Sequence, residues 1–354
     1  METRVNRAEV LLENWREQEQ RLAKFGEHNG STYRELLRQR YIFLRAGVWR
    51  LGMDVRPNEK ANLQLLKGAL ARMERQLRSN VVLRLWARLR AAVLERPKMI
   101  KEFRAMKEDN LLELKRFLSD RGFGVLVAGL ERELDFERNW FAMRMSAALD
   151  GGARIEMELE MARDLNGRYH PTLIDATLVG ADGTSRNHGF PLGDPLDAGM
   201  VVNLMQGRAV CVGERDAHGE VSEKWLQIHF EHADSYPRNF YPDYGFDAGR
   251  LLGDFARQTG IAGLDDVRLL DGLKKGNQVA FDGGAAFGGK LLLEADPSAR
   301  QLAVLDGDGK RISLVELLER KRAHEAGLGR ERANGREVEL RPKRTRAKGK
   351  GLEL

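Results

Sequence analysis

The sequence predicts an α+β fold with a basic helical bundle at the N-terminus, an α+β region of β-hairpins with two helix–hairpin units, and a disordered basic tail. Three observations carry this prediction. Apolar residues recur at helical spacing near the N-terminus, alternate with polar residues from about residue 139, and lose any periodicity after Gly327. We therefore divide the chain into a helical region over 1–107, helices with antiparallel hairpins over 108–195, two helix–hairpin units and a terminal helix over 196–319, and a tail over 320–354.

The first region contains four amphipathic segments that read as helices. Breaks between them are predicted at Gly26, between Gly52 and Pro57, at Asn80, and at Pro97. Short breaks of this kind join antiparallel neighbours in a helical bundle. A further capped helix near Asp109 and the segment "GVLVAGLERELD" precede the first strands.

Strict alternation identifies the hairpins of the second region. The segments "NWFAMRMSAAL" and "ARIEMELEMA" alternate apolar and polar residues and are joined by a turn over 150–152. One face of the second strand carries Ile155, Met157, Leu159 and Met161, and the other carries Glu156, Glu158 and Glu160. We interpret the glutamates as a solvated sheet face and not as a metal site. A second hairpin is predicted to turn over 181–183.

A short sequence motif occurs twice in the third region. The spacing Leu-x-x-Gly-x-x-Val occurs at 204–210 and again at 273–279. Each copy predicts a helix that stops at a glycine with positive φ and a hairpin that follows it. The helix–hairpin units are expected at about 200–230 and 269–296. Both gene duplication and chance are compatible with so short a motif.

Charge is partitioned along the chain. The net charge of +6 combines 24 basic and 12 acidic residues in 1–107, 23 basic and 36 acidic in 108–319, 12 basic and 4 acidic in 320–350, and Glu353. Two basic ends that flank an acidic centre indicate separate roles for these regions.

Several classes of function lack their signatures. A single cysteine, Cys211, excludes an internal disulfide framework. It lies in the apolar strand "AVCV", so we expect a buried, inert thiol. The chain has no apolar run of membrane-spanning length and no signal-peptide core at its start, so we predict a cytoplasmic protein without membrane contact.

Candidate chemistry in loops and strands is weak. The loop 282–290 departs from a phosphate-binding loop, the loop 306–310 reads as a turn, and His229 to His232 fit a polar strand face. We therefore predict no enzyme, no cofactor and no metal. An enzyme would require convergence of polar groups around His229, Glu231 and Arg238.

Basic residues provide the candidate nucleic-acid contacts. Arginines at helical spacings lie opposite an apolar stripe that contains Val82, Leu85, Trp86, Leu89 and Val93; they are Arg72, Arg75, Arg84 and Arg88. The tail adds Arg341, Lys343, Arg344 and Arg346. Such cations could follow a phosphate backbone, and the alternatives are a solvated face or pairing with acidic groups of the same chain or of a partner.

The segment "NFYPDYGFD" concentrates aromatic residues at 239–247. Asp247 is a predicted helix cap, with Pro237 and Pro242 expected to break the strand before it. Tyr244 and Phe246 should pack at this strand-to-helix corner. Phe240 and Tyr241 are the candidates for an exposed aromatic contact with bases.

An ordered series of segments between about residues 98 and 319 resembles a family of uncharacterised proteins encoded on conjugative and related mobile elements of anaerobic bacteria. The match is carried by "MKEDNLLELKRFLSDRGFG", "DATLVGADGTSRNHGFPL", "NLMQGRAVCV", "WLQIHFE", "NFYPDYGFDAGRLL", "LKKGNQV" and "LLLEADPSARQLAVLDGDGKRI". The family is a domain of unknown function, so the resemblance implies an accessory role on a mobile element and transfers no site residues.

Two functional hypotheses follow from the sequence. The first is a non-enzymatic accessory protein that contacts DNA or RNA through its basic helical region and tail. The second is a protein-interaction or oligomerisation module that docks a basic partner on its acidic α+β region. A large exposed apolar patch on the helices would favour an interaction module.

Overall fold

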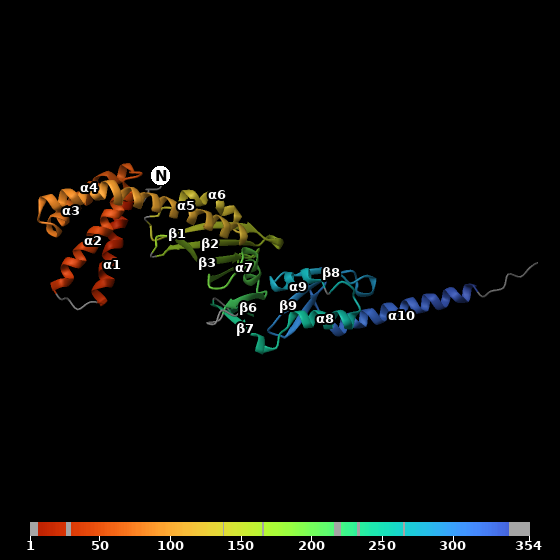
Figure 1. Cartoon of the computed structure of the whole chain (residues 1–354). Helices are drawn as coiled ribbons and strands as arrows, with labels where there is room; N and C mark the ends of the chain where they lie inside the picture. Colours follow the sequence, from red (N-terminus) through yellow and green to blue (C-terminus); the bar gives the residue numbers. More distant parts are fainter. Residues whose placement is uncertain are drawn as a thin grey trace, which may run out of the picture. The chain divides into compact units, whose positions relative to one another are not determined.

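The structure is a computed structural model, and it confirms the predicted α+β class. It describes residues 6–25, 30–136, 138–164, 166–215, 221–231, 234–264 and 266–339. The chain forms two compact units (Figure 1). The first comprises Met1–Leu149, Glu156–Ala176 and Gly189–Gly193, and the second comprises Asp150–Ile155, Thr177–His188 and Asp194–Leu354.

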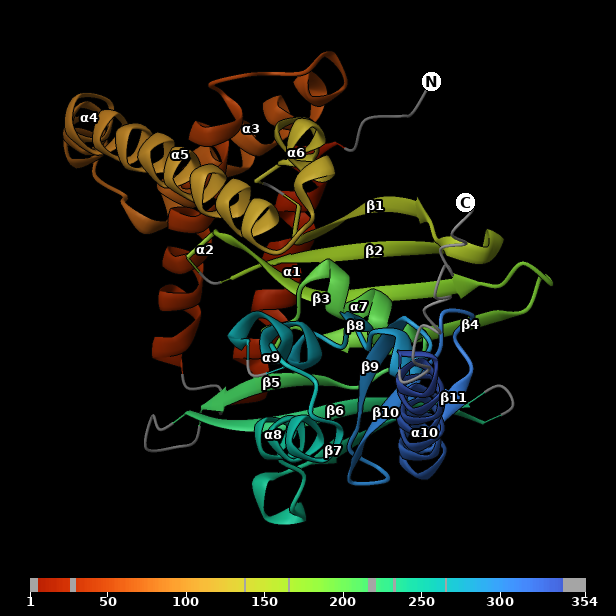
Figure 2. The ribbon, with the colours of Figure 1, turned by 90° about the vertical axis from the view of Figure 1, so that its right-hand side faces the viewer.

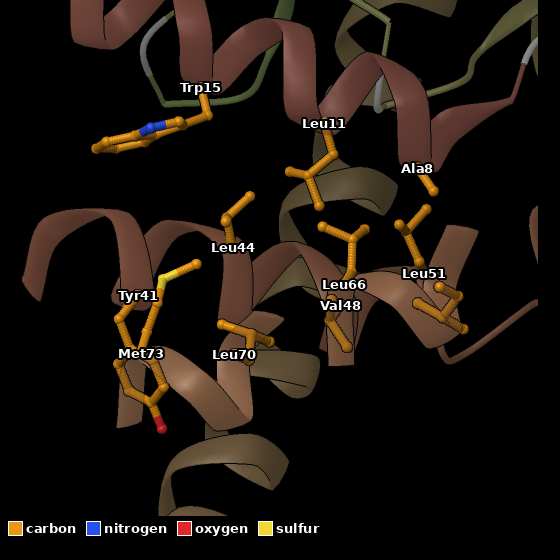
Figure 3. Close-up of a cluster of buried hydrophobic side chains, with 11 residues drawn as sticks. Ala8, Leu11, Trp15, Tyr41, Leu44, Val48, Leu51, Leu66, Leu70 and Met73 are labelled. Atoms are coloured by element: carbon orange, nitrogen blue, oxygen red, sulfur yellow. The ribbon is translucent and has the colours of Figure 1, made fainter. Parts of the chain in front are cut away.

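Three helices build the apolar core of the N-terminal region: α1 (Arg7–Phe25), α2 (Gly30–Leu51) and α3 (Lys60–Leu77). Figure 3 shows their buried side chains pointing toward one another: Ala8, Leu11 and Trp15 from α1, Tyr41, Leu44, Val48 and Leu51 from α2, and Leu66, Leu70 and Met73 from α3. At Gly47 a side-chain carbon would lie 2.4 Å from Leu11 Cδ2. Glycine at this position therefore allows α1 and α2 to pack closely.

The helix break predicted at Pro97 is wrong. Helix α4 (Val81–Arg90) continues through a π-helical turn (Ala91–Glu95) into α5 (Arg96–Asp120). In the wide turn the amide of Arg96 donates to the carbonyl of Ala91, five residues earlier. Because proline lacks an amide hydrogen and its ring crowds the preceding turn, a locally widened turn lets the helix pass Pro97. Helix α5 also crosses the boundary that we predicted at residue 107.

A four-stranded antiparallel sheet follows α6 (Val127–Glu133) in the chain. Its strands lie in the order β1 (Trp140–Ala148), β2 (Arg154–Arg163), β3 (Tyr169–Val179) and β4 (Ser185–Pro191), as Figure 2 shows. The predicted apolar face of β2 is buried from Ile155 to Met161, and Glu158 on the other face pairs with Arg144 at 2.7 Å. The side-chain amide of Asn110 on α5 bonds both the amide and the carbonyl of Tyr169, which fixes the helix to the start of β3.

A buried ion pair anchors the start of α1 in the first unit. The carboxylate of Glu59, 1% exposed, accepts hydrogen bonds from Arg7 Nε at 2.6 Å, from Arg7 Nη2 at 2.8 Å and from the amide of Arg56 at 3.0 Å. Burial opposes ionisation of Glu59, but these hydrogen bonds lower its pKa below the ordinary value of 4.5. The buried carboxylate of Glu59 is thus ionised and hydrogen-bonded to Arg7 and Arg56.

From Ala198 onward the second unit contains two similar runs of elements. The first run is α7 (Ala198–Met205), β5 (Val210–Arg215), β6 (Val221–Glu231), β7 (Asp234–Phe240) and α8 (Ala248–Thr259). The second run is α9 (Val267–Lys274), β8 (Val279–Asp282), β9 (Lys290–Asp296), β10 (Gln301–Leu305), β11 (Arg311–Ile312) and α10 (Leu314–Glu339). Each run is a helix, an antiparallel meander and a second helix (Figures 1 and 2). The structural repeat is therefore longer than the predicted helix–hairpin unit.

Both sequence-echo glycines end their helices in the same way. At Gly207 and at Gly276, φ is +82° and +80°. Each glycine amide bonds the carbonyl three residues earlier, and the next amide bonds the carbonyl five residues earlier. This is the pattern of a helix that stops at a left-handed residue. The predicted helix ends are confirmed.

The two helix ends differ in their surroundings. Asn203 of α7 donates from Nδ2 to the carbonyl of Lys275 at 2.6 Å and to Asn277 Oδ1 at 2.9 Å. A methyl group at Gly276 would lie 2.8 Å from the carbonyl oxygen of Ala209, whereas a methyl group at Gly207 would have no atom within 4 Å. The end of α9 therefore depends on glycine for both conformation and space.

Two boundaries differ from the sequence prediction. Pro237 was expected to break a strand, but it lies opposite Ile228 in the edge strand β7, and edge strands are where sheets tolerate proline. Helix α10 extends to Glu339, so the beginning of the segment predicted to be disordered is helical.

We expect Gly276→Ala to lower the free energy of unfolding of the second unit by about 3 kcal/mol, since an alanine there combines a left-handed conformation with a clash. Gly207→Ala is the matched control and should cost about 1 kcal/mol, from conformation alone. Urea unfolding of both variants checks this difference. Equal losses would show that the close approach of Ala209 is not what requires glycine.

Loss of the Glu59 charge should destabilise the first unit. We expect Glu59→Gln to lower its free energy of unfolding by about 3 kcal/mol at neutral pH, because Arg7 stays buried without a counter-ion. Since the folded-state pKa of Glu59 is lowered, its contribution is present above the ordinary pKa and is lost as the pH falls through the lowered one. Urea titrations across acidic pH should show this loss in the native protein and in the exposed control Glu35→Gln, and not in Glu59→Gln.

Candidate interaction surface

The turn between α3 and α4 positions the basic residues that we predicted as a site. Helix α3 ends at Leu77, and the side chain of Asn80 caps α4 by accepting from the amide of Val82 at 2.8 Å. The break predicted at Asn80 is thus confirmed. The short connection holds α4 against the end of α3.

Two of the four predicted arginines bond to groups of the fold. Arg88 turns toward α3, and its Nε and Nη2 lie 2.8 and 2.7 Å from Glu74 Oε2. The hydrogen bond with this carboxylate, which is 5% exposed, and then its charge raise the pKa of Arg88. Arg84 donates from Nη1 to the carbonyls of Arg78 and Ser79. These two side chains support the fold, so charge reversal at either would not be a clean test of binding.

The other two predicted arginines lie on α3. Arg72 and Arg75 are exposed, and neither pairs with a carboxylate of the described residues. The predicted tail residues Arg341, Lys343, Arg344 and Arg346 lie outside the described residues.

The rotation of α4 exposes its apolar side. We call this side the α4 apolar face; its members are 58 to 72% exposed and are Val81, Val82, Leu83, Leu85, Trp86, Leu89, Val93 and Leu94. In the helical run from Val81 to Glu95, the buried residue is Ala91, which is 8% exposed. The sequence pattern was correct about two opposite faces, and the apolar one is the face that meets solvent.

A groove beside this face collects arginines from three helices. We call it the arginine groove; it has a volume of about 740 Å³ and is lined by Arg34, Glu35, Arg38, Tyr41, Ile42 and Arg45 of α2, Leu77 and Arg78 at the end of α3, and Trp86, Ala87, Arg90 and Glu95 of the α4 run. Five arginines therefore face two glutamates. This excess of positive charge makes the groove a candidate site for anions.

The glutamates of the arginine groove neutralise only part of its charge. Glu95 is shared, at 2.8 Å from Arg45 Nη2 and 3.4 Å from Arg90 Nε. Glu35 lies 3.8 Å from Arg38 Nη1 at the surface. Arg34 is exposed and, among the described residues, contacts no carboxylate.

An aromatic ring lies at the edge of the arginine groove. Trp86 is 61% exposed, and the guanidinium of Arg90 lies 5.8 Å from its ring centroid. An exposed indole beside cations is the arrangement on which a nucleobase can stack.

Sequence reasoning missed the arginines on α2. Arg34, Arg38 and Arg45 recur at helical spacing and lie apart from the core positions Leu44 and Val48. That spacing was available as a signal. Their neighbours on α3 and α4 were not, because only tertiary packing brings the three helices together.

The aromatic segment 239–247 packs mainly as predicted, with one error. Asp247 caps α8 through the amide of Arg250 at 3.0 Å, and the ring of Phe246 meets Trp225 at 5.0 Å between centroids. Phe240 was expected to be exposed, but it is 7% exposed because it pairs across the sheet with Trp225. Tyr241, 47% exposed, remains the accessible aromatic residue.

Two of the three residues of the enzyme hypothesis, His229 and Arg238, contact Tyr236 on sheet β5–β6–β7, and the side chain of Glu231 lies outside the described part of the structure. The ring of His229 stacks on Tyr236 at 5.8 Å, and Arg238 lies over the same tyrosine at 5.8 Å. Burial raises the pKa of the half-buried Cys211 thiol to about 12, so the thiol is protonated at neutral pH. In the described part of the chain no group of three or more His, Cys, Asp or Glu side chains is arranged to hold a metal ion.

Comparisons with family models, curated proteins and solved structures give no match to this chain. No helix within the described ranges is both long enough and apolar enough to cross a membrane. The site must therefore be interpreted from its own geometry.

Proposed function

We propose that the protein is a non-enzymatic, cytoplasmic accessory protein of a mobile genetic element that binds DNA or RNA through the arginine groove. The observation that carries the nucleic-acid part is the gathering of five arginines against two glutamates beside the exposed ring of Trp86. The mobile-element part rests on the resemblance of residues 98–319 to proteins of such elements.

The geometry suits a phosphate backbone. Arg34, Arg38 and Arg45 extend over about 16 Å of α2, at 1.5 Å per residue. Guanidinium groups bind phosphate oxygens through paired hydrogen bonds and release condensed counter-ions. Trp86 adds a stacking contact that depends little on base identity. Binding of this kind is strong at low salt and has little sequence preference, and the basic tail would add to it.

A second candidate function is a protein-interaction module. The exposed α4 apolar face favours it, because proteins seldom leave so many neighbouring large apolar side chains in water. Docking of a basic partner on the acidic region 108–319 stays a prediction from the sequence.

Charge reversal in the arginine groove should weaken nucleic-acid binding. For Arg34→Glu/Arg38→Glu we expect lower affinity for short duplex DNA, and a slope of log K against log salt that is smaller by about 2, because about 0.9 counter-ion is released per phosphate contact. Fluorescence anisotropy across a salt series, with single-stranded DNA and RNA in parallel, measures both quantities.

The control Arg72→Glu/Arg75→Glu changes the net charge by the same amount on the exposed side of α3. It should retain most of the affinity. Equal losses of affinity in the two variants would show that binding depends on net charge and not on the arginine groove. Undetectable binding by the native protein at low salt would refute the proposed function.

A further inference from the structure

We propose that the α4 apolar face is one strand of a two-helix coiled coil and that it binds an acidic amphipathic helix of another protein. The proposal rests on the exposed side chains of the α4 apolar face; Trp86 is shared with the arginine groove, and the other seven members of the face do not line that groove. It concerns the surface that nucleic-acid binding leaves unexplained.

The spacing of the exposed residues is that of a coiled-coil seam. Within α4, Val82, Trp86 and Leu89 follow one another at intervals of four and three residues, and Val93 continues the exposed apolar side in the wide turn; all four are about 60 to 72% exposed. Alternating intervals of three and four keep a seam on one side of a helix, where it packs against a second helix. Arg88 and Ala91 lie on the other side of α4, against the bundle.

The dimensions fit a single partner helix. The α4 apolar face runs from Val81 to Leu94, which is about 20 Å of helix, or nearly four turns. Leu83 and Leu85 lie on either side of the seam and widen it, as residues beside a coiled-coil core do. Burial of these side chains would remove a contiguous apolar patch from water, and that is the main driving force of helix docking.

The charges beside the seam identify the kind of helix. Arg90 lies beside the seam and Arg96 lies at its end, and both arginines are exposed. The acidic residue in the run, Glu95, is already shared between Arg45 and Arg90. A partner with glutamates beside its own apolar seam would match this pattern, since flanking charges set partner choice in coiled coils.

A second copy of this chain fits less well. Pairing two α4 helices would bring the arginines of each copy beside those of the other, without acidic residues to compensate. An anionic membrane is the other surface that an exposed apolar helix face with flanking arginines can bind. Both occupants are outcomes of the test.

The test uses the full chain and two designed helical peptides. Both carry leucine at the seam positions; one has glutamate and the other lysine at the flanking positions. By isothermal titration calorimetry we expect the glutamate peptide to bind at least about tenfold more tightly than the lysine peptide. Leu85→Ser/Leu89→Ser should weaken its binding by about tenfold or more.

The matched control is Leu65→Ser/Leu112→Ser, which removes two equally exposed leucines from α3 and α5 and should change the affinity by less than about twofold. Circular dichroism should show all variants folded, because each replaced side chain is exposed. Absence of binding by the glutamate peptide, equal binding of both peptides, or equal effects of the two double variants would overturn the proposal.

Two further results would replace the proposed occupant. Sedimentation that shows self-association of the native protein, lost in Leu85→Ser/Leu89→Ser, without peptide binding would identify a second copy. Binding to phosphatidylglycerol vesicles, against phosphatidylcholine vesicles as control, that the glutamate peptide does not compete for would identify a membrane surface. Either result overturns the proposal for an acidic helix.

Discussion

The ion pair between Glu74 and Arg88 fixes how α4 is rotated about its axis, and both candidate surfaces depend on that rotation. Glu74 is buried on α3, and a buried carboxylate without a cation is strongly destabilising. Holding Arg88 against Glu74 places Arg90 and Trp86 at the groove and turns the apolar side chains to solvent. A helix that would ordinarily contribute its leucines to a core thus packs on α3 through an ion pair whose arginine is half exposed.

The second unit is held together by the ends of two helices. Asn203 of α7 bonds the carbonyl of Lys275, and Gly276 lies against Ala209. Because each of these residues belongs to the corresponding part of one repeat, the two runs of elements contact each other through their most similar segments. The sequence echo therefore marks a packing interface as well as a repeated topology.

Local patterns predicted local structure well. Alternation in 154–163 predicted β2 and its buried face, and the two glycines predicted the ends of α7 and α9. These features depend on neighbouring residues, so the sequence contains their whole cause. The expectation that proline breaks a helix or strand failed at two positions. At Pro97 the preceding wide turn accommodates the ring, and at Pro237 the proline lies in an edge strand, which tolerates it.

The site was harder to predict for the same reason. Periodicity shows that α4 has an apolar and a basic side, but only Glu74 on another helix decides which side faces the bundle. The arginine groove needs three helices, so no single stretch of sequence contains it. Phe240 was misjudged because its cross-strand partner, Trp225, lies fifteen residues earlier in the chain.

The widened turn at Ala91–Glu95 has a geometrical effect on the long helix that contains it. A turn with an extra residue shifts the angular phase of everything that follows, by about the 100° that one residue subtends. The side of α4 that faces α3 is therefore out of step with the side of α5 that carries Asn110 toward Tyr169. One continuous helix can in this way present one side to α3 and a differently oriented side to Tyr169. The angle between these two sides is set by the five-residue wide turn.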